Sequence, residues 1–327
     1  MRLAIDEAWK YQGLTYPNPA VGCSVVGSYG EILAVEAHKC AGEAHAEVEA
    51  LKTAYFKLTN DKNILDITNS SQIHNYLLKN HNNCFKDISL YTTLEPCSHI
   101  GKTPSCASLI SCLGLKEVFV GSKDLNKEAS GGNNIIKKSG TLVKTKILEE
   151  ECELLLAPFN MWNKKSFVFF KWAQRLNGTT DGGIISSQYS RKLTHAMRNI
   201  CDLLVIGGNT VRIDRPTLDA REVNGKAPDI LIISQEKEFD KTIPLFNIKD
   251  RKVIIEDNFS VLNKYKNIMI EGTSTMFELT LNIVDYYLCF IAPTIGGKGG
   301  LINIDSKFKV LHTSKEVKDI MMWIKRL

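Results

Sequence analysis

The sequence predicts an α/β protein built from two domains. The chain has 327 residues, which fits about two domains of roughly 100–200 residues each. Strand and helix patterns alternate along both halves, and this alternation is typical of α/β folds. A helical pattern at residues 146–164 is expected to end at Pro158, and a strand pattern then restarts. We therefore expect domains over residues 1–147 and 148–327.

The first half shows alternating strand and helix signals up to residue 120. Helices are predicted at residues 2–12, 44–58 and 103–113, and strands at residues 21–26, 31–37, 88–94 and 116–120. Residues 59–86 between them are polar and rich in Asn, with one short helix predicted around 73–78. We expect this segment to be a surface excursion distant from the chemistry.

The second half repeats the α/β pattern. Strands are predicted at residues 167–172, 203–206, 230–233, 253–255, 268–270 and 286–291, and helices at residues 187–200 and 274–281.

Composition excludes several classes of protein. Hydrophobic residues make up 44% and charged residues 24% of the chain, close to globular averages. The formal charge of +5 comes from scattered Lys and Arg without a basic run, so we expect no nucleic-acid partner. No stretch of about 18 apolar residues predicts a membrane span. Nine scattered cysteines without a signal peptide predict a cytoplasmic protein with reduced thiols.

Three short segments carry the candidate chemistry of the first half: His45-Ala46-Glu47, Pro96-Cys97 and Cys106. A catalytic zinc site needs three protein ligands and one position open to water, whose pKa the metal lowers toward neutrality. His45, Cys97 and Cys106 supply three ligands, and the Glu47 carboxylate can carry a proton to a leaving amine. A His-x-Glu followed by Pro-Cys and a second Cys is the arrangement of zinc deaminases.

Each of these residues taken alone also has a structural explanation, because histidines before helices and cysteines at helix starts often serve packing. Here, however, His45 and Cys106 lie at predicted helix starts, where the helix dipole favours thiolates. The combination therefore predicts a metal site.

The second half lacks the G-x-G-x-x-G fingerprint of ordinary dinucleotide sites. Two glycine turns, at residues 207–210 and 272–275, offer backbone N–H groups suited to cofactor phosphates, although either can be an ordinary tight turn. Lys171, Arg198 and Arg221 suit a sugar phosphate, although such residues are often only solvated surface charges.

The spacing of the cysteines and the neighbouring motifs point to one family. Eight residues separate Cys97 from Cys106, whereas nucleoside and tRNA deaminases use a C-x-x-C spacing. The segment from Pro96 to Cys106, together with residues 18–22 and 41–47, resembles the deaminase half of the bifunctional riboflavin-biosynthesis deaminase/reductase. The second half resembles the reductase half of the same family. One mild departure is Ser105, where the family has Pro.

The resemblance implies a cytidine-deaminase-like α/β/α sandwich followed by a dihydrofolate-reductase-like α/β domain. The implied cofactors are Zn²⁺, held by His45, Cys97 and Cys106, and NADPH. Glu47 is implied as the catalytic proton carrier. Substrate contacts are implied at Asn18, His99, Lys102, Thr103, Lys171, Arg198, Leu218, Arg221 and Glu271, and NADPH contacts at Gln174, Thr210, Asp214, Ser234, Thr273, Ser274 and Thr275. Asn18 as a turn residue, His99 as a loop cap and Lys102 as a surface charge remain alternatives.

The implied activity consists of two consecutive reactions on one pyrimidine. The 2-amino group of 2,5-diamino-6-ribosylamino-4(3H)-pyrimidinone 5′-phosphate is hydrolysed, and NADPH then reduces the ribosyl group to ribityl. We also expect a homo-oligomer, a dimer or tetramer, with no membrane partner. Residues 175–178 and the loop before Ile184 depart from the family pattern, which weakens the detailed cofactor assignment.

Two other functions remain in competition. One is a deaminase of free nucleosides or tRNA with an added binding domain, which the cysteine spacing and the second half disfavour. The other is a zinc-stabilised binding module, which would not need Glu47.

Overall fold

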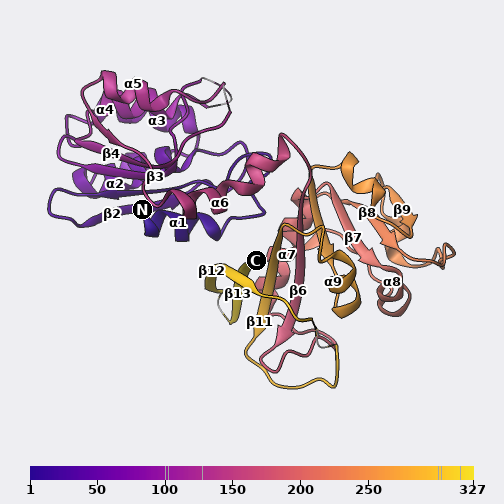
Figure 1. Ribbon diagram of the computed structural model, residues 1–327. Helices are drawn as coiled ribbons and strands as arrows, with labels where there is room; N and C mark the ends of the chain where they lie inside the picture. Colours follow the sequence, from indigo (N-terminus) through magenta and orange to yellow (C-terminus); the bar gives the residue numbers. More distant parts are fainter. Residues whose placement is uncertain (100, 102, 127, 301, 303, 317) are drawn as a thin grey trace. The chain divides into compact units, whose positions relative to one another are not determined.

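The computed structural model describes residues 1–99, 101, 103–126, 128–300, 302, 304–316 and 318–327. The chain divides into two compact units, Met1–Asn160 and Met161–Leu327 (Figure 1). Each unit is built around one sheet of its own, with five strands in the first and eight in the second. Both halves are therefore α/β, as the sequence predicts.

The first unit alternates strands and helices along the chain. Its strands are β1 (Gly22–Val26), β2 (Ile32–Ala37), β3 (Ser89–Leu94), β4 (Glu117–Ser122) and β5 (Leu142–Lys144). Its helices are α1 (Arg2–Trp9), α2 (Ala46–Thr59), α3 (Ser70–Asn80), α4 (Cys106–Leu113), α5 (Gly132–Lys138) and α6 (Glu149–Trp162). The strand order is β2-β1-β3-β4-β5, with β1 antiparallel to both neighbours and β3, β4 and β5 parallel.

Helices cover both faces of this sheet. Gly22 lies under α1, where an added Cβ would come within 1.8 Å of the Ala4 carbonyl oxygen, so only glycine allows this close approach. Gly121, on the same face by strand register, lies under Cys152 of α6. The opposite face packs against α2 and α4 through Cys23, Val25 and their neighbours. The unit is thus the predicted α/β/α sandwich.

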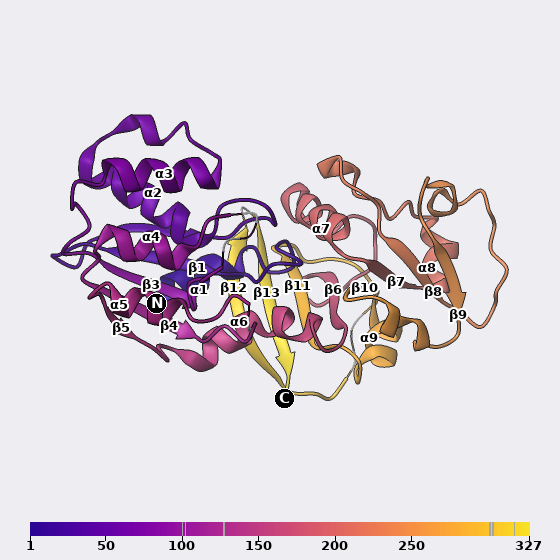
Figure 2. The ribbon, with the colours of Figure 1, turned by 90° about the horizontal axis from the view of Figure 1, so that it is seen from above.

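Residues 59–86 correct a prediction, because this segment is part of the core. Ile73, Leu77 and Phe85 are completely buried, and Ile64 joins them in the same hydrophobic cluster as α2 and α4. Helix α3 lies against α2 and α4, as Figure 2 shows for α2. Within this segment, the buried residues Ile73 and Leu77 of α3 recur at helical spacing and form an apolar stripe. The Asn-rich turns around them make the segment polar on average, and that average hides the stripe.

We expect Leu77→Ala to destabilise the protein by about 2–5 kcal/mol, because it opens a cavity in this core. Leu65→Ala is the matched control, since Leu65 lies in the same segment but is 44% exposed. Urea unfolding of the full chain measures both variants. Equal stability of the two would contradict the packing described here.

Helix α6 also differs from expectation, because Pro158 lies inside it and does not end it. A proline in a helix interior removes one hydrogen bond. Leu155, Leu156 and Trp162 are buried on either side of it, and this packing offsets the loss. The sequence therefore predicted the end of this helix four residues too early, at Pro158 instead of Trp162.

The second unit is an α/β domain built on one mostly parallel sheet, as the sequence predicts. Its strands are β6 (Phe167–Arg175), β7 (Leu203–Gly207), β8 (Asp229–Ile233), β9 (Val253–Glu256), β10 (Asn267–Glu271), β11 (Tyr286–Ala292), β12 (Phe308–Glu316) and β13 (Asp319–Arg326). Its α-helices are α7 (Gln188–Ile200), α8 (Gly208–Asp214) and α9 (Ser274–Thr280). The order β12-β13-β11-β6-β10-β7-β8-β9 is parallel from β11 to β9, and the β12–β13 hairpin adds antiparallel strands at one edge.

Alternation along β10 places helices on both faces of this sheet. Ile268 and Ile270 pack with Met276 and Phe277 of α9. Glu271 points to the opposite face, because successive side chains of a strand alternate. There it pairs with α7, so α7 and α9 cover opposite faces.

Candidate active sites

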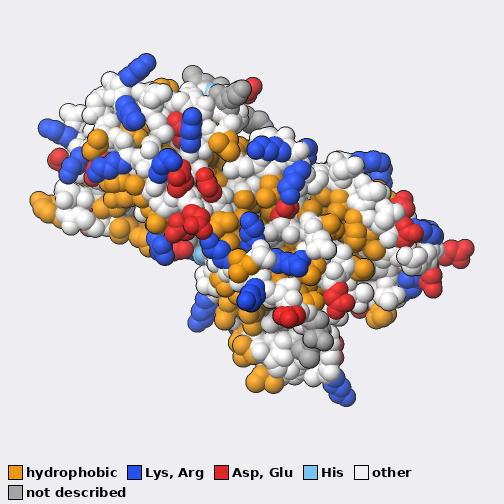
Figure 3. All heavy atoms as spheres, in the orientation of Figure 1, with side chains coloured by type: hydrophobic (Ala, Val, Ile, Leu, Met, Phe, Trp, Pro, Cys, Tyr) orange, Lys and Arg blue, Asp and Glu red, His pale blue; other side chains and the backbone are white. Residues whose placement is uncertain are grey.

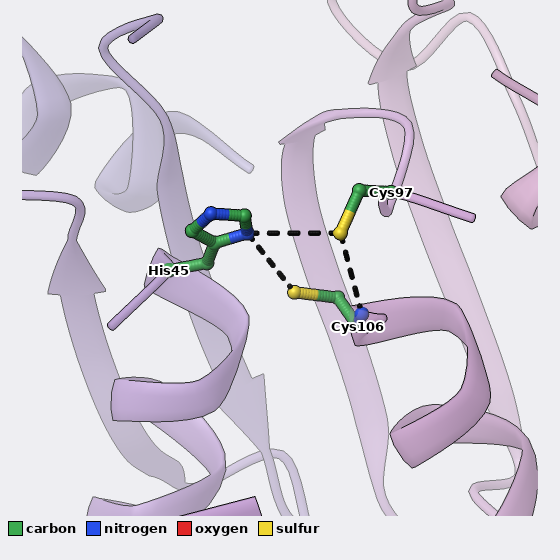
Figure 4. Close-up of side chains that lie close together, drawn as sticks. All are labelled: His45, Cys97 and Cys106. Carbon is green, nitrogen blue, oxygen red and sulfur yellow. Dashed lines mark hydrogen bonds between the residues drawn. The ribbon is translucent and has the colours of Figure 1, made fainter. Parts of the chain in front are cut away.

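The three proposed zinc ligands come together at the starts of two helices of the first unit. His45 is the residue that caps α2, Cys97 follows β3, and Cys106 is the first residue of α4. Ser105 caps α4, because its hydroxyl accepts a hydrogen bond from the N–H of Ser108. The ligands therefore belong to rigid helix ends. Figure 4 shows the imidazole and both sulfur atoms pointing toward one another.

The distances among these atoms fit a tetrahedral zinc ion. Zn–S bonds of about 2.3 Å and Zn–N bonds of about 2.0–2.1 Å place nitrogen and sulfur ligands roughly 3.5 Å apart. Nδ1 of His45 lies 3.7 Å from Sγ of Cys97 and 3.3 Å from Sγ of Cys106. All three ligand atoms lie within 4.8 Å of one another. This donor set of one imidazole and two thiols suits zinc.

Charge favours the same assignment. The hydrogen bond from Cys106 and the nearby His45 lower the pKa of Cys97 to about 4. The backbone N–H of Cys106, at the start of α4, also donates to the sulfur of Cys97 at 3.4 Å. Within this pair Cys97 is the thiol that ionises more readily, whereas the hydrogen bond with Cys97 and burial raise the pKa of Cys106. The thiolate is the form that binds metal.

Thr103 orients the imidazole from its far side. Nε2 of His45 lies 3.4 Å from the Thr103 hydroxyl, while Nδ1 faces the thiols. A metal-binding histidine commonly donates its second N–H to such a partner, which fixes the ring. Thr103, which the resemblance places at the substrate, thus also supports a ligand.

Glu47 lies in the first turn of α2 beside these ligands and is 4% exposed. Burial raises the pKa of its carboxyl, despite the opposing effect of His45. A buried carboxyl of raised pKa exchanges protons near neutral pH more readily than an exposed one. Its position and burial fit the role of proton carrier.

One cavity of about 490 Å³ joins most of the residues predicted for the first unit. Asn18, His99 and Thr103 line it together with His45 and Glu47, and Cys97 also contributes. Lys102, the remaining predicted substrate residue, lies outside the described residues. A second cavity of about 460 Å³ shares Gly42, Glu43 and Thr103 with the first and is also lined by residues 68–71. Residues 68–71 of the 59–86 segment therefore lie beside a cavity that shares Thr103 with the catalytic one, nearer to the chemistry than expected.

Two functional neighbours were missed from the sequence. His38 is buried beside Asn18 and Ala44, and burial lowers its pKa to about 4. Glu95 is also buried and accepts hydrogen bonds from the N–H groups of Asp124, Gly131 and Asn133 at 3.1–3.3 Å. Glu95 thereby holds the loop that lines the cavity after β4. Its place directly before Pro96-Cys97 was the available signal, whereas nothing local singled out His38.

In the second unit, the predicted residues gather at the carboxyl ends of adjacent parallel strands. Glu271 at the end of β10 is in register with Lys171 of β6 and Ile206 of β7. The turns after β7 and β10 approach each other, because Met276 lies close to both Gly207 and Gly272. Ligands of open α/β sheets bind at this edge.

The predicted NADPH residues are placed around the same edge. Thr273 occupies the N-cap position of α9, and Ser274 and Thr275 lie in its first turn. Neither at Thr273 nor at Gly207 does a described side chain accept a hydrogen bond from the helix N–H groups. Ser234 follows β8 beside Gly208. Gln174 lies on β6, where it accepts a hydrogen bond from Trp172, and Thr210 is in α8. Asp214 lies at the far end of α8 and is exposed.

Arg198 and Glu271, both predicted to bind substrate, are paired with each other. Nε and Nη2 of Arg198 donate to the two carboxylate oxygens of Glu271 at 2.7 and 2.8 Å. Although burial opposes the charge, Arg198 and Lys171 lower the pKa of Glu271 to about 2. Burial lowers the pKa of Lys171 itself. Leu218 is buried and gives its carbonyl to Arg251, while Arg221 pairs with Asp219 at the surface.

We expect Arg198→Ala to destabilise the protein by about 3–5 kcal/mol, because it leaves a buried carboxylate without its partner. Arg221→Ala is the matched control, since its ion pair with Asp219 is exposed and worth at most about 1 kcal/mol. Urea unfolding separates the two. We also expect Arg198→Ala to raise the KM for the reductase substrate more than the KM for NADPH, and the reverse order would contradict the substrate assignment.

Comparison with known proteins agrees with both halves of the chain. The family described as "Cytidine and deoxycytidylate deaminase zinc-binding region" matches residues 1–122, and "RibD C-terminal domain" matches residues 167–321. The riboflavin biosynthesis protein RibD of Aquifex aeolicus is 30% identical over 100% of this chain and 97% of its own. The chain belongs to the RibD family. RibD of Actinobacillus pleuropneumoniae is 28% identical over 98% of this chain and 93% of its own.

Solved RibD-type structures have the same fold. A Thermotoga maritima diaminohydroxyphosphoribosylaminopyrimidine deaminase/5-amino-6-(5-phosphoribosylamino)uracil reductase superposes with a TM-score of 0.63 at 26% identity, covering 100% of this chain and 97% of its own. RibD of Acinetobacter baumannii superposes with a TM-score of 0.61 at 23% identity, covering 100% of this chain and 97% of its own. At this identity the likeness shows the fold alone.

Membership in the RibD family confirms the function predicted from the sequence. The chain is a bifunctional deaminase and reductase of riboflavin biosynthesis that acts on small molecules. Zn²⁺ and NADPH are confirmed as the cofactors of its two RibD activities. No helix within the described residues is long and apolar enough to cross a membrane. Basic and acidic side chains are interspersed on the visible face in Figure 3.

Proposed function

We propose that the first unit deaminates 2,5-diamino-6-ribosylamino-4(3H)-pyrimidinone 5′-phosphate at its 2-amino group, and that the second unit reduces the ribosyl group with NADPH. The observation that carries the first part is the cluster of His45, Cys97 and Cys106 at the edge of the cavity that Glu47 also lines. In this proposal residues 1–147 form the deaminase domain and residues 148–327 the reductase domain. The compact units divide later, after Asn160, because α6 packs on the first sheet through Cys152.

The deamination assigns a distinct role to each group. His45, Cys97 and Cys106 hold zinc, which when bound supplies a water activated at neutral pH. Glu47 takes the proton of the attacking water and returns it to the leaving amine, which departs as ammonia. Asn18, His99, Lys102 and Thr103 bind the substrate, with Lys102 attracting its phosphate.

NADPH, when bound, would supply a hydride for the sugar carbon, with the accompanying proton coming from solvent, and the residues of the second unit would hold the nicotinamide against that carbon. Gln174, Thr210, Asp214, Ser234, Thr273, Ser274 and Thr275 are proposed for NADPH. Lys171, Arg198, Leu218, Arg221 and Glu271 are proposed for the substrate. One observation supports this assignment: Lys171, Glu271 and both glycine turns lie at the same edge of the sheet.

The test incubates the full chain with the diaminopyrimidine ribosyl phosphate, zinc and NADPH, followed by the mass of the product. We expect replacement of the amino group by a carbonyl without NADPH, and further reduction when NADPH is present. Turnover of free cytidine in preference to this substrate would contradict the proposal.

We also propose that the protein is cytoplasmic and forms a homo-oligomer, a dimer or tetramer. Light scattering tests the oligomeric state.

A further inference from the structure

One histidine of the deaminase cavity contacts both the residue proposed to bind substrate and the backbone before a zinc ligand. Nε2 of His38 lies 3.0 Å from the amide nitrogen of Asn18. On the other side of the ring, Nδ1 lies 3.1 Å from the carbonyl oxygen of Ala44, the residue before His45. His38 is 3% exposed, and these are the two hydrogen-bond contacts of its ring within the described part of the chain.

The chemistry of these contacts fixes the proton of the ring. A carbonyl oxygen can only accept a hydrogen bond, so Nδ1 of His38 carries the hydrogen. Nε2 faces the amide nitrogen of Asn18, which can donate a hydrogen bond but cannot accept one, so Nε2 accepts through its lone pair.

The donor to that lone pair must be the amide nitrogen of Asn18, because the amide oxygen has no hydrogen to give. The nitrogen is thus engaged by His38, and the orientation of the carboxamide is set. Asn18 lines the cavity, so its oxygen remains as the group available to a bound molecule.

We infer that His38 is a positioning residue that orients the Asn18 carboxamide so that its oxygen accepts a hydrogen bond from the substrate. The deaminase site therefore selects a pyrimidine that presents an N–H donor to Asn18 and disfavours one that presents an acceptor there. The inference rests on the proposed function in one respect, that Asn18 contacts the substrate.

The connection also links substrate recognition to the metal site. The rings of His38 and His45 meet edge to face, with centroids 5.6 Å apart. The same imidazole that orients Asn18 holds the peptide leading into His45. Without it the Asn18 amide can turn over and present its N–H₂ group, and a mispaired polar group in such a site is costly to binding.

The test is a double-mutant cycle on the zinc-loaded full chain, with His38→Phe, Asn18→Ala and the double variant. Phenylalanine keeps a ring of similar size but cannot accept a hydrogen bond. We expect each single variant to raise the deaminase KM by roughly tenfold, with a smaller effect on kcat. In the Asn18→Ala background, His38→Phe should change KM by less than about twofold, because its partner is gone. His38→Gln, whose side-chain oxygen can accept, should recover part of the loss.

Each other outcome counts against the inference in a distinct way. An equal effect of His38→Phe with and without Asn18 means that His38 acts by another route. Loss of zinc from His38→Phe means that the ring only supports His45. If Asn18→Ala leaves KM unchanged, the proposed substrate contact fails, and the selection of an N–H donor fails with it.

The tautomer of His38 provides a measurement that does not depend on activity or on the folding of a variant. Nitrogen-15 spectra of the unaltered protein, with His38 assigned by comparison with His38→Phe or by sequential correlation, should show the hydrogen on Nδ1 and none on Nε2. A hydrogen on Nε2 would overturn the orientation of Asn18 even if every kinetic result agreed.

Discussion

Cys97→Ala is expected to remove zinc and abolish deamination together. Three ligand atoms converge in the site, so the loss of one leaves two, which do not hold zinc in a catalytic geometry. Removal of a residue that merely orients a ligand costs roughly 10–100-fold, so removal of a ligand should cost at least about a hundredfold in activity. Zinc content by elemental analysis and ammonia release measure the two losses on the same sample.

Cys112→Ala is the matched control for this experiment. Cys112 lies on the same helix, α4, as the ligand Cys106, but it is exposed and outside the ligand cluster. We expect it to retain one zinc per chain and full deamination. The Cys97→Ala protein should still oxidise NADPH when given the deaminated pyrimidine, because the residues proposed for reduction belong to the second unit. Normal zinc content in Cys97→Ala would remove Cys97 from the ligand set.

Helices and strands could be predicted from the sequence where the spacing of their apolar residues matches the positions that are buried in the structure. Helix α2 has Val48, Leu51, Ala54 and Tyr55 on its buried face, at the spacing that the sequence shows. The strands of the second sheet are short apolar runs bounded by turns, and β10 starts and ends within one residue of its predicted range. Such runs are recognisable because both of their faces are covered.

Other elements depend on contacts that no local pattern reveals. No local pattern predicts α5, β5 or the β12–β13 hairpin. β5 has three residues and, among the described strands, pairs only with β4, and β12 is an edge strand whose exposed Val310 breaks the apolar pattern. Tertiary packing also overrode two local signals, the polarity of residues 59–86 and the proline of α6.

The candidate site divides in the same way. His45, Glu47, Cys97 and Cys106 could be proposed from the sequence because one reaction requires those residue types at that spacing. Nothing about His38 in isolation indicates its contact with Asn18, since only the pairing of β1 with β2 brings together the residues that flank the open end of this hairpin. The pairing of Arg198 with Glu271 likewise arises only when α7 packs on the sheet beside β10.

Glu47→Gln is expected to separate the two activities of the chain. Glutamine has nearly the same shape as glutamate, and Glu47 is not one of the three clustered ligand residues, so zinc content should remain one per chain. Deamination should fall by about 10²–10⁴-fold, because an amide cannot take a proton from water and return it to the leaving amine. Product mass and ammonia release measure this loss at saturating substrate.

Glu49→Gln supplies the control, since Glu49 lies in the same first turn of α2 but does not line the cavity of Glu47. It should deaminate normally. When the deaminated pyrimidine is supplied ready-made, the Glu47→Gln protein should oxidise NADPH at the rate of the unaltered chain, because reduction is proposed for residues of the second unit alone. Full deamination by Glu47→Gln would remove its role as proton carrier. Failure to consume NADPH, at cofactor levels well above those of a typical reductase, would mean that reduction depends on the first unit or does not take place in this chain.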